Sequence, residues 1–280
     1  MNKIIKKERL NENVSKIIVE SPQIARAAQP GQFIVVIPTP TAERIPLTIA
    51  DTDKEAGTIT IIFQIVGATT KLLDTLDVGG EIPNLLGPLG QPTHIEKYGT
   101  VVVIGGGVGI AEIYPMVKAL EAAGNEVITI IGARNKDLLI YEKELSAVSS
   151  RLLVTTDDGS SGRKGFVSDE LLAIIAAKKT INLVFAVGPV PMMRVCADVT
   201  RAHNIKTVVS LNPIMLDATG MCGVCRVTVG GQTKFACVDG PEFDGHAVDF
   251  AELISRLKTF RAEEQQALDH VCKLVAGVKR

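Results

Sequence analysis

A short apolar run that ends in glycines constrains the fold of this chain more than any other segment. Thr100 to Ile104 is a continuous strand-like run, the turn Gly105-Gly-Gly-Val-Gly109 follows it, and a helical pattern extends from Ala111 to Ala123. Continuous apolar strands are typical of parallel sheets that are buried on both faces. Similar runs, separated by helical segments, lie at 126–131, 151–155 and 183–187. The middle of the chain is therefore predicted to form a doubly wound α/β sheet.

The segment from Lys3 to about Lys97 has a different texture. Short β-rich runs at 16–20, 32–37 and 58–66 are separated by Pro, Gly, Asn and Asp turns, which is typical of a small antiparallel barrel. One helix-like stretch, Thr69–Leu76, has two threonines positioned to cap its N-terminus. A boundary near residues 97 to 100 gives a barrel domain of residues 1–98 and an α/β domain of residues 99–210.

From about Leu211 the alternation stops, and residues 211–280 are predicted to be a cysteine-bearing segment followed by one charged helix from about Asp249 to Val275. Three of the chain's five cysteines lie within sixteen residues of this segment: Cys222, Cys225 and Cys237. An odd number of cysteines, clustered in this way, favours a metal site in a reducing compartment over a disulfide framework.

Charge and hydropathy exclude several classes of function. Lys and Arg total 30 against 31 Asp and Glu, with no dense basic stripe, so we expect no nucleic-acid partner. The apolar runs are strand-sized and well short of the roughly 20 residues that span a bilayer, and the basic start, Met1 to Glu8, is followed by polar and charged residues. We expect a cytoplasmic protein that has no membrane partner.

The cysteine spacing predicts an iron–sulfur cluster. Cys222 and Cys225 are three apart, so one tight loop can direct both sulfurs to one centre, and Gly220 and Gly223 free the backbone to direct N–H groups at them. Plant-type [2Fe-2S] proteins use a Cys, four residues, a Cys, two residues, a Cys and a distant Cys. Here the first of these positions is Asp217, whose carboxylate is a candidate fourth ligand.

Other interpretations of this segment stay open. A structural zinc also accepts three thiolates and a carboxylate, although the chain lacks a second CxxC or a His pair at zinc spacing. The thiols can also be unliganded, Asp217 can simply form a turn, and His246 is a further candidate ligand. Cys196 and Cys272 lie on helical patterns and are predicted to be packing cysteines.

A flavin site is predicted in the N-terminal region. An Arg such as Arg44 can pair with a pyrophosphate, and a Thr hydroxyl beside a strand end, such as that of Thr48, can hydrogen-bond a flavin N5. Thr69 and Thr70 would present a helix N-terminus to the same phosphates. The alternative is that Arg44-Ile-Pro-Leu-Thr48 only begins a strand and the threonines are simple caps.

A nucleotide site is predicted at the glycine turn. Glycines between a strand and a helix let the backbone approach a ligand's phosphates, although the spacing Gly105, Gly107, Ile110 fails the Gly-x-Gly-x-x-Gly fingerprint at its last position. A tight strand-to-helix turn is the alternative. Two more strand ends, 155–160 and 188–193, carry similar features, and an open α/β sheet binds ligands at such ends.

The residues near the nucleotide give conflicting signals for its identity. Asp157 and Asp158 would repel a 2′-phosphate and so favour NADH, whereas Arg134 and Lys136 favour NADPH.

Taken in order, these motifs resemble the ferredoxin-NADP reductase superfamily across nearly the whole chain. They are Arg44-x-Pro-Leu-Thr48, the glycine turn, Thr156-Asp-Asp-Gly159, Gly188-Pro-x-Pro-Met192 and the cysteines. More narrowly, the chain resembles dihydroorotate dehydrogenase electron-transfer subunits, which would have Cys at position 217. Asp217 resembles the small (alpha) subunits of NADH-dependent reduced ferredoxin:NADP oxidoreductases, also called sulfide dehydrogenase beta subunits. One departure is Glu112, where relatives commonly have Pro.

The resemblance implies FAD on the barrel, NAD(H) at the glycine turn and a [2Fe-2S] cluster near the flavin. The implied FAD contacts are Arg44, Pro46, Leu47, Thr48, Ile62, Phe63, Gln64, Gly67, Thr69 and Thr70. The implied NAD contacts are Gly106, Gly107, Val108, Gly109, Thr156, Asp157, Asp158, Gly159, Gly188, Pro189 and Met192. The implied cluster ligands are Asp217, Cys222, Cys225 and Cys237.

These cofactors predict an NAD(P)H-linked flavin iron–sulfur oxidoreductase subunit. Hydride passes between nicotinamide C4 and flavin N5 and single electrons pass through the cluster, with no acid–base residue expected. The resemblance implies a bifurcating heterodimer in which a larger iron–sulfur flavoprotein subunit handles ferredoxin and NADP. The alternatives are the electron-transfer subunit of a dihydroorotate dehydrogenase and a non-enzymatic iron–sulfur redox sensor.

Overall fold

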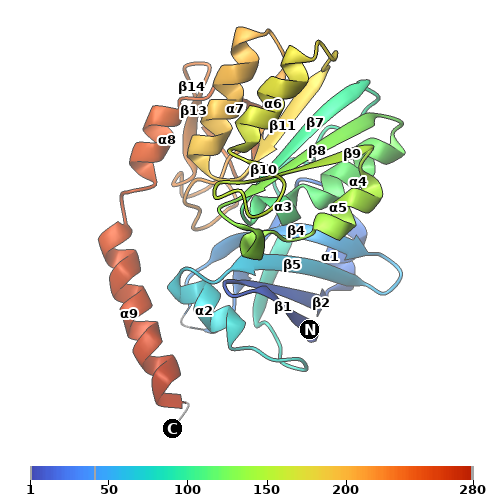
Figure 1. Ribbon diagram of the computed structural model, residues 1–280. Coiled ribbons are helices and arrows are strands. Elements are labelled where there is room, and N and C mark those ends of the chain that lie inside the picture. Colours follow the sequence, from blue (N-terminus) through green and yellow to red (C-terminus); the bar gives the residue numbers. More distant parts are fainter. Residues whose placement is uncertain (1, 41, 279–280) are drawn as a thin grey trace.

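The computed structural model describes residues 2–40 and 42–278 and contains two large sheets (Figure 1). A six-stranded antiparallel sheet comes from the N-terminal third, in blue and cyan. A seven-stranded, mainly parallel sheet from the middle of the chain lies above it in this view. A two-stranded hairpin and two further helices form the C-terminal part.

The antiparallel sheet has the strand order β1-β2-β5-β4-β3-β6. Its strands are β1 (Ile4–Asn11), β2 (Val14–Glu20), β3 (Phe33–Ile37), β4 (Ile45–Asp53), β5 (Thr58–Gln64) and β6 (Asn84–Leu89). The predicted antiparallel barrel-like sheet is confirmed, although the described strands do not form a closed barrel. The start of β1 meets the segment before β6 at the isolated bridge Lys3 to Glu81 and through backbone hydrogen bonds between Ile4 and Gly79–Gly80. The sheet curls without a continuous closing ladder.

Two short helices cover this sheet, α1 (Pro22–Ala27) and α2 (Ala68–Asp74). The core between them contains Ile17, Ile34, Phe63 and Leu73, all fully or almost fully buried. The two threonines lie inside the first turn of α2 and not before it. Gly67 is the N-cap, and the Thr70 hydroxyl accepts a 3.0 Å hydrogen bond from its N–H.

The mainly parallel sheet has the order β10-β9-β8-β7-β11-β12-β15. Its strands are β7 (Thr100–Gly106), β8 (Glu126–Ala133), β9 (Arg151–Thr156), β10 (Arg163–Lys164), β11 (Leu183–Val187), β12 (Thr207–Ser210) and β15 (Glu242–Asp244). The chain leaves β7 toward β8 on one side and later returns to β11 on the other. This reversal creates a switch point at the carboxyl ends of β7 and β11, where open α/β sheets bind ligands.

Helices cover both faces of this sheet, which confirms the doubly wound prediction. They are α3 (Gly109–Glu112), α4 (Tyr114–Ala122), α5 (Glu142–Val148), α6 (Val167–Ala176) and α7 (Val190–Ala202), with a 3-10 turn at Lys136–Leu138. Side chains of β7 alternate between two cores. Val101 and Val103 pack on the α3 and α4 side, and Val102 and Ile104 on the α6 and α7 side.

The helix predicted over 111–123 is instead two helices, α3 and α4. The chain turns at Ile113, which is buried, and Pro115 follows in the first turn of α4. Proline has no N–H to continue a helical ladder, and it is favoured in a first turn, where that N–H would be unpaired. The break fixes α3 as a separate short element beside the glycine turn.

The C-terminal part contains the hairpin β13 (Arg226–Val229) and β14 (Gln232–Phe235), α8 (Phe250–Arg256) and α9 (Arg261–Val278). Its strand β15 pairs antiparallel with β12 at the edge of the large sheet. The single charged helix predicted from Asp249 is wrong. The Thr259 hydroxyl donates a 2.7 Å hydrogen bond to the Arg256 carbonyl oxygen at the end of α8, and α9 begins anew at Arg261.

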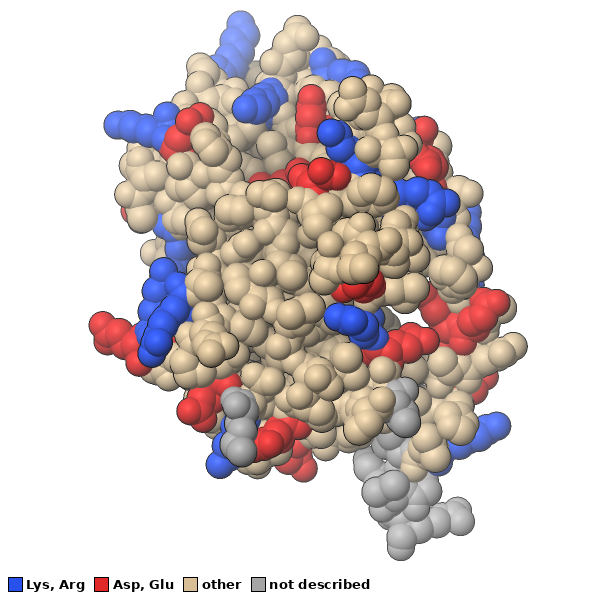
Figure 2. All heavy atoms as spheres, turned by 180° about the vertical axis from the view of Figure 1, so that it is seen from behind, with Lys and Arg blue, Asp and Glu red and all other residues tan. Residues whose placement is uncertain are grey.

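Helix α9 packs along α2 and projects past the N-terminal sheet (Figure 1). Within residues 2–40 and 42–278, no helix has the length and apolar character needed to span a bilayer. On the face opposite to that of Figure 1, acidic and basic side chains are interspersed around a broad uncharged centre (Figure 2).

Candidate functional site

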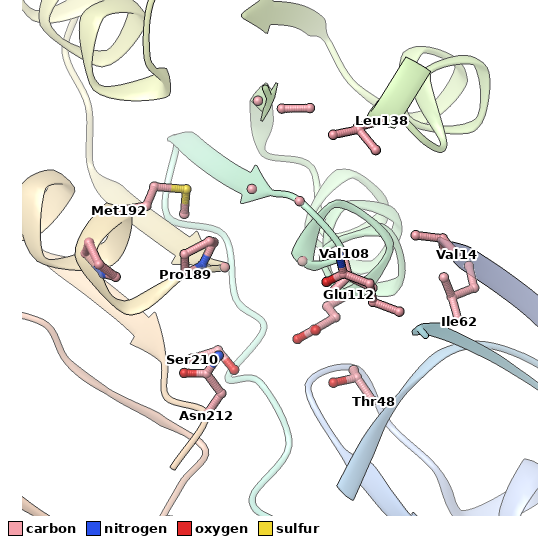
Figure 3. Close-up of a pocket in the computed structure, with 18 of the residues that line it drawn as sticks. Val14, Thr48, Ile62, Val108, Glu112, Leu138, Pro189, Met192, Ser210 and Asn212 are labelled. Atoms are coloured by element: carbon pink, nitrogen blue, oxygen red, sulfur yellow. The ribbon is translucent and has the colours of Figure 1, made fainter. Parts of the chain in front are cut away.

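A cavity of about 740 Å³ lies where the two large sheets meet (Figure 3). One wall comes from β4 and β5 of the antiparallel sheet, and the other from the loops after β7, β8, β11 and β12. The cavity therefore occupies the switch point of the parallel sheet, and its second wall is the antiparallel sheet.

The antiparallel wall contains most of the residues predicted to bind flavin. They are Pro46, Leu47 and Thr48 from β4 and Ile62, Phe63 and Gln64 from β5. Phe33 of β3 pairs with Thr48 of the neighbouring strand β4 and lines the same wall. Gly67, Thr69 and Thr70 do not line this cavity, since Thr69 is buried in α2 and the Thr70 hydroxyl bonds to Gly67.

Arg44 also lies outside the lining of this cavity but has an unsatisfied donor. Its Nε is buried and, within the part of the chain that the structure describes, has no hydrogen-bond partner. The same guanidinium is close enough to Asp217 to help lower the pKa of that carboxyl. Buried donors are normally paired, so Arg44 is suited to an anionic group between the flavin motif and the cysteine loop.

The nucleotide motifs supply much of the other wall. The lining includes Gly106, Gly107, Val108, Gly109, Asp157, Gly188, Pro189 and Met192. Thr156, Asp158 and Gly159 do not line it. The Thr156 hydroxyl donates a 2.7 Å hydrogen bond to the Ser161 carbonyl oxygen. The Asp158 carboxylate accepts hydrogen bonds from the Ser160 N–H and hydroxyl. These residues shape the loop beside the cavity.

Two glycines give this turn an exposed backbone and close helix–strand packing, although the usual fingerprint is absent. Gly107 has φ +59°, and a Cβ there would meet no atom within 4 Å, so its backbone is open to a ligand. At Gly109 a Cβ would lie 2.6 Å from the Val187 carbonyl oxygen. Gly109 therefore allows the close packing of α3 on β11 that the last fingerprint glycine usually allows.

Glu112 is a cavity residue that the sequence interpretation treated only as a departure. Its carboxyl points toward the Thr48 hydroxyl (Figure 3). Burial raises the pKa of Glu112 above its ordinary value, and the hydrogen bond to Thr48 opposes that rise. A partly buried carboxyl facing a hydroxyl in a ligand cavity can hold or release a proton there.

Other lining residues were also missed. Ser210 ends β12, which lies next to β11 in the sheet, and Asn212 follows it. Asn11 ends β1, and Asn13 lies in the turn between β1 and β2. Thr207-Val-Val-Ser210 is a short β-branched run, so the end of that strand was a detectable signal.

The cysteine loop brings two of its three thiols together. Cys225 Sγ lies 3.2 Å from Cys237 Sγ, and both residues are buried. Burial and the Cys225 thiol raise the pKa of Cys237 to about 12, whereas backbone N–H groups, first that of Val224, lower the pKa of the exposed Cys222. Over residues 2–40 and 42–278, no three His, Cys, Asp or Glu side chains form a ready metal-binding group.

The loop nevertheless has the donors that a cluster needs. Gly220 and Gly223 have φ of +87° and +68°, and the Gly220 backbone hydrogen-bonds the Cys237 sulfur. Such N–H groups directed at sulfur stabilise bound thiolates. The thiols, with backbone donors around them, fit an iron–sulfur cluster by their chemistry.

The Asp217 carboxylate is used within its own loop. It accepts hydrogen bonds from the Thr219 N–H at 3.0 Å, from the Thr219 hydroxyl at 2.7 Å and from the Met221 N–H at 3.2 Å. These bonds lower the pKa of Asp217. The arrangement is that of a turn-forming Asp, and Oδ1, which accepts only from the Thr219 hydroxyl, keeps a lone pair that a ligand could use.

The remaining candidates lie away from this loop. Cys196 is fully buried in α7, as expected of a packing cysteine. The Cys272 sulfur accepts a 2.9 Å hydrogen bond from Lys71 Nζ, and this bond joins α9 to α2. His246 Nε2 lies 2.9 Å from the Thr200 hydroxyl.

Two family models match this chain. Residues 103–198 match the oxidoreductase NAD-binding domain, and residues 212–249 match the iron-sulfur cluster binding domain of dihydroorotate dehydrogenase B. The first match contains the glycine turn and the second contains Asp217 and the three clustered cysteines.

Three proteins illustrate what the whole chain resembles. A dihydroorotate dehydrogenase B (NAD(+)) electron transfer subunit homolog from Thermotoga maritima is 47% identical over 98% of this chain and 96% of its own. The electron transfer subunit of dihydroorotate dehydrogenase B (NAD(+)) from Bacillus caldolyticus is 32% identical over 83% of this chain and 91% of its own. A chain from a solved structure of NADH-dependent reduced ferredoxin-NADP oxidoreductase, described for flavin-based electron bifurcation, is 47% identical with a TM-score of 0.92, covering 96% of this chain and 97% of that one.

Proposed function

Because the chain belongs to the family of dihydroorotate dehydrogenase B electron transfer subunits and their homologues, we propose that it passes electrons between NAD(H), FAD and a [2Fe-2S] cluster. The observation that carries this proposal is the shared cavity. Thr48 and Gln64 on one wall face the loops of Gly107 and Pro189 on the other. A flavin and a nicotinamide that react by hydride transfer must meet in one enclosed space, and this cavity offers it.

Each wall is suited to one cofactor. The β4 and β5 wall, together with the buried Arg44 Nε, is suited to FAD. The open backbone at Gly107 beside the start of α3 is suited to the nicotinamide nucleotide. The proposed FAD and NAD residues remain those named from the sequence, with Phe33, Ser210 and Asn212 added as neighbours.

Asp217, Cys222, Cys225 and Cys237 are the proposed cluster ligands. The hydrogen bonds from Thr219, together with the Arg44 guanidinium, lower the pKa of Asp217, and the effect of Arg44 supports a cluster close to the flavin motif. Bound together, FAD, NAD(H) and the [2Fe-2S] cluster would supply hydride exchange and single-electron transfer. The chain's own residues would hold these three groups within reach of one another.

Anaerobic visible spectroscopy tests this function directly. The purified chain should show flavin bands and a broad iron–sulfur absorbance, and NADH should bleach the flavin. Protein that lacks flavin bands, or flavin that NADH leaves oxidised, contradicts the proposal. A Thr48→Val variant serves as the comparison, since it should keep the protein folded but slow the bleaching.

We further propose that the electrons continue to a larger iron–sulfur flavoprotein subunit. The similarity at 47% identity and TM-score 0.92 to a chain of NADH-dependent reduced ferredoxin-NADP oxidoreductase supports a bifurcating heterodimer in which the partner handles ferredoxin and NADP. Asp217 favours this assignment over a dihydroorotate dehydrogenase, since the resemblance gives the latter a Cys at this position.

Purification of the tagged chain from its native cells tests the partner. A larger iron–sulfur flavoprotein should co-purify, and the complex should reduce NADP⁺ only when NADH and reduced ferredoxin are both present. A complex that oxidises dihydroorotate would replace this assignment with the dihydroorotate dehydrogenase one.

A further inference from the structure

Glu112 is held rigidly beside the proposed flavin wall. It ends α3, which packs against β7, β4 and β11, and the tight approach of Gly109 to Val187 fixes the start of that helix. Thr48 belongs to β4, one of the strands that α3 contacts. The Glu112 carboxyl and the Thr48 hydroxyl, which are far apart in the sequence, therefore face each other from two elements in direct contact (Figure 3).

The surroundings of Glu112 are poor in charge. Within the described residues no cation forms an ion pair with Glu112. The titratable side chains on the elements packed against α3, or lining the same cavity, are Asp51, Asp53, Tyr114, Lys118, Glu121, Arg134 and Asp157. Asp51 and Lys118 pair with each other at 3.0 Å. Glu112 is thus able to take up or release a proton without breaking an ion pair.

The proposed electron path leaves a proton to be placed. A hydride from NADH brings two electrons and one proton to the flavin, whereas an iron–sulfur cluster passes single electrons and no proton. For each hydride, two electrons go on to the partner's one-electron acceptor and one proton must leave the flavin. Some group in the cavity has to receive it.

We propose that Glu112 is this group and exchanges the proton with the flavin through the Thr48 hydroxyl. The inference rests on the proposed function and deepens it. Thr48 Oγ1 accepts the proton while its own hydroxyl proton moves to the Glu112 carboxylate, so one O–H bond forms at Glu112 as one breaks at Thr48. Glu112 then releases the proton to water in the cavity, and electron flow in the opposite direction reverses each step. Glu112 therefore fills the acid–base role that the sequence did not predict.

The first test measures the pKa of Glu112 by titrating the oxidised protein, since Glu112 can receive the flavin proton only at a pH above that pKa. Infrared spectra recorded across pH should contain a protonated carboxyl band that persists to higher pH than the bands of exposed glutamates. The band should be absent in Glu112→Gln, which keeps the shape of the side chain but cannot titrate. The band should be present in Glu121→Gln, a control variant at an exposed glutamate on the neighbouring helix α4. A band that is unchanged in Glu112→Gln overturns the proposal.

The second test separates proton transfer from hydride transfer. Flavin reduced by NADH is mixed with ferricyanide, a one-electron acceptor, in H₂O and in D₂O. Glu112→Gln and Thr48→Val should slow reoxidation about 10²-fold and change its solvent isotope effect, more than they slow reduction by NADH, and Thr48→Ser should restore the rate.

The outcomes separate the two proposals. Reoxidation at the wild-type rate in Glu112→Gln, with NADH-reducible flavin present, overturns the role of Glu112 and leaves the proposed function intact. Wild-type protein in which NADH does not reduce flavin overturns both.

Discussion

Thr93 Oγ1 donates a 2.5 Å hydrogen bond to the carboxyl of Glu242. Thr93 lies in the segment that joins the antiparallel sheet to the parallel sheet, and Glu242 begins β15. Three parts of the chain meet here, because the Thr93 N–H also bonds to the Pro30 carbonyl oxygen. Burial raises the pKa of Glu242 to about 7, and the hydrogen bond from Thr93 opposes the rise.

This raised pKa predicts a loss of stability between about pH 4.5 and 7. Below that window the folded and unfolded chains both hold the proton. Within it only the folded chain does, so the free energy of unfolding falls as pH rises, by up to about 3 kcal/mol, and then levels off above pH 7. Glu242→Gln should remove this slope and raise the melting temperature at pH 8. Glu263→Gln, an exposed control on α9, should keep the wild-type slope. An unchanged slope in Glu242→Gln contradicts the assignment.

A pair of glycines separates ligand access from backbone strain. Gly107 and Gly79 are both exposed, have φ of +59° and +90°, and have open space where a Cβ would be, but only Gly107 lines the cavity. Ala at either position should lower the free energy of unfolding by about 1 kcal/mol, because L-residues are strained in this conformation. Only Gly107→Ala should weaken NADH binding, about tenfold or more, by calorimetric titration. Equal affinities in the two variants would remove Gly107 from the nucleotide site.

Local pattern predicted the elements of this fold well, and tertiary packing determined what it missed. The run Leu183–Val187 is apolar throughout because both faces of β11 are buried, and such runs are visible in sequence. The pairing of Glu242–Asp244 with β12 leaves no comparable pattern in three residues, and the strand was not predicted.

The site shows the same division. The order of motifs predicted which loops line the cavity, since each lies at a strand end. The approach of Glu112 to Thr48 depends on how α3 sits against β4, and the approach of Arg44 to Asp217 on how the cysteine loop folds back. No local spacing encodes either arrangement.

Asp217 and Cys225 should differ in what their replacement does to the cluster. Cys225 is buried with its sulfur beside that of Cys237, so Cys225→Ser should abolish most iron binding and the associated absorbance. Asp217→Cys supplies a fourth thiolate, so the cluster should remain while its reduction potential shifts. Iron analysis and electron paramagnetic resonance measure both. Cys272→Ser, at a cysteine outside the loop, should leave iron content and signal unchanged. An Asp217→Cys signal identical to wild type would identify Asp217 as a turn residue only.

Weakening the contact between α9 and α2 should let α9 detach while the two sheets stay folded. Helix α9 packs on α2, where Val271 is only 7% exposed. The adjacent Cys272 sulfur accepts a 2.9 Å hydrogen bond from Lys71 Nζ of α2. Val271→Ala removes buried apolar area worth about 1–2 kcal/mol, which is a large share of what holds one exposed helix in place. Hydrogen exchange over 261–274 should accelerate about tenfold, while the melting temperature of the two sheets stays within a degree or two. Leu274→Ala, at a side chain 52% exposed, should exchange like wild type. If Val271→Ala instead lowers protection throughout both sheets, α9 unfolds together with the rest of the chain, and its docking on α2 contributes to the global stability of the protein.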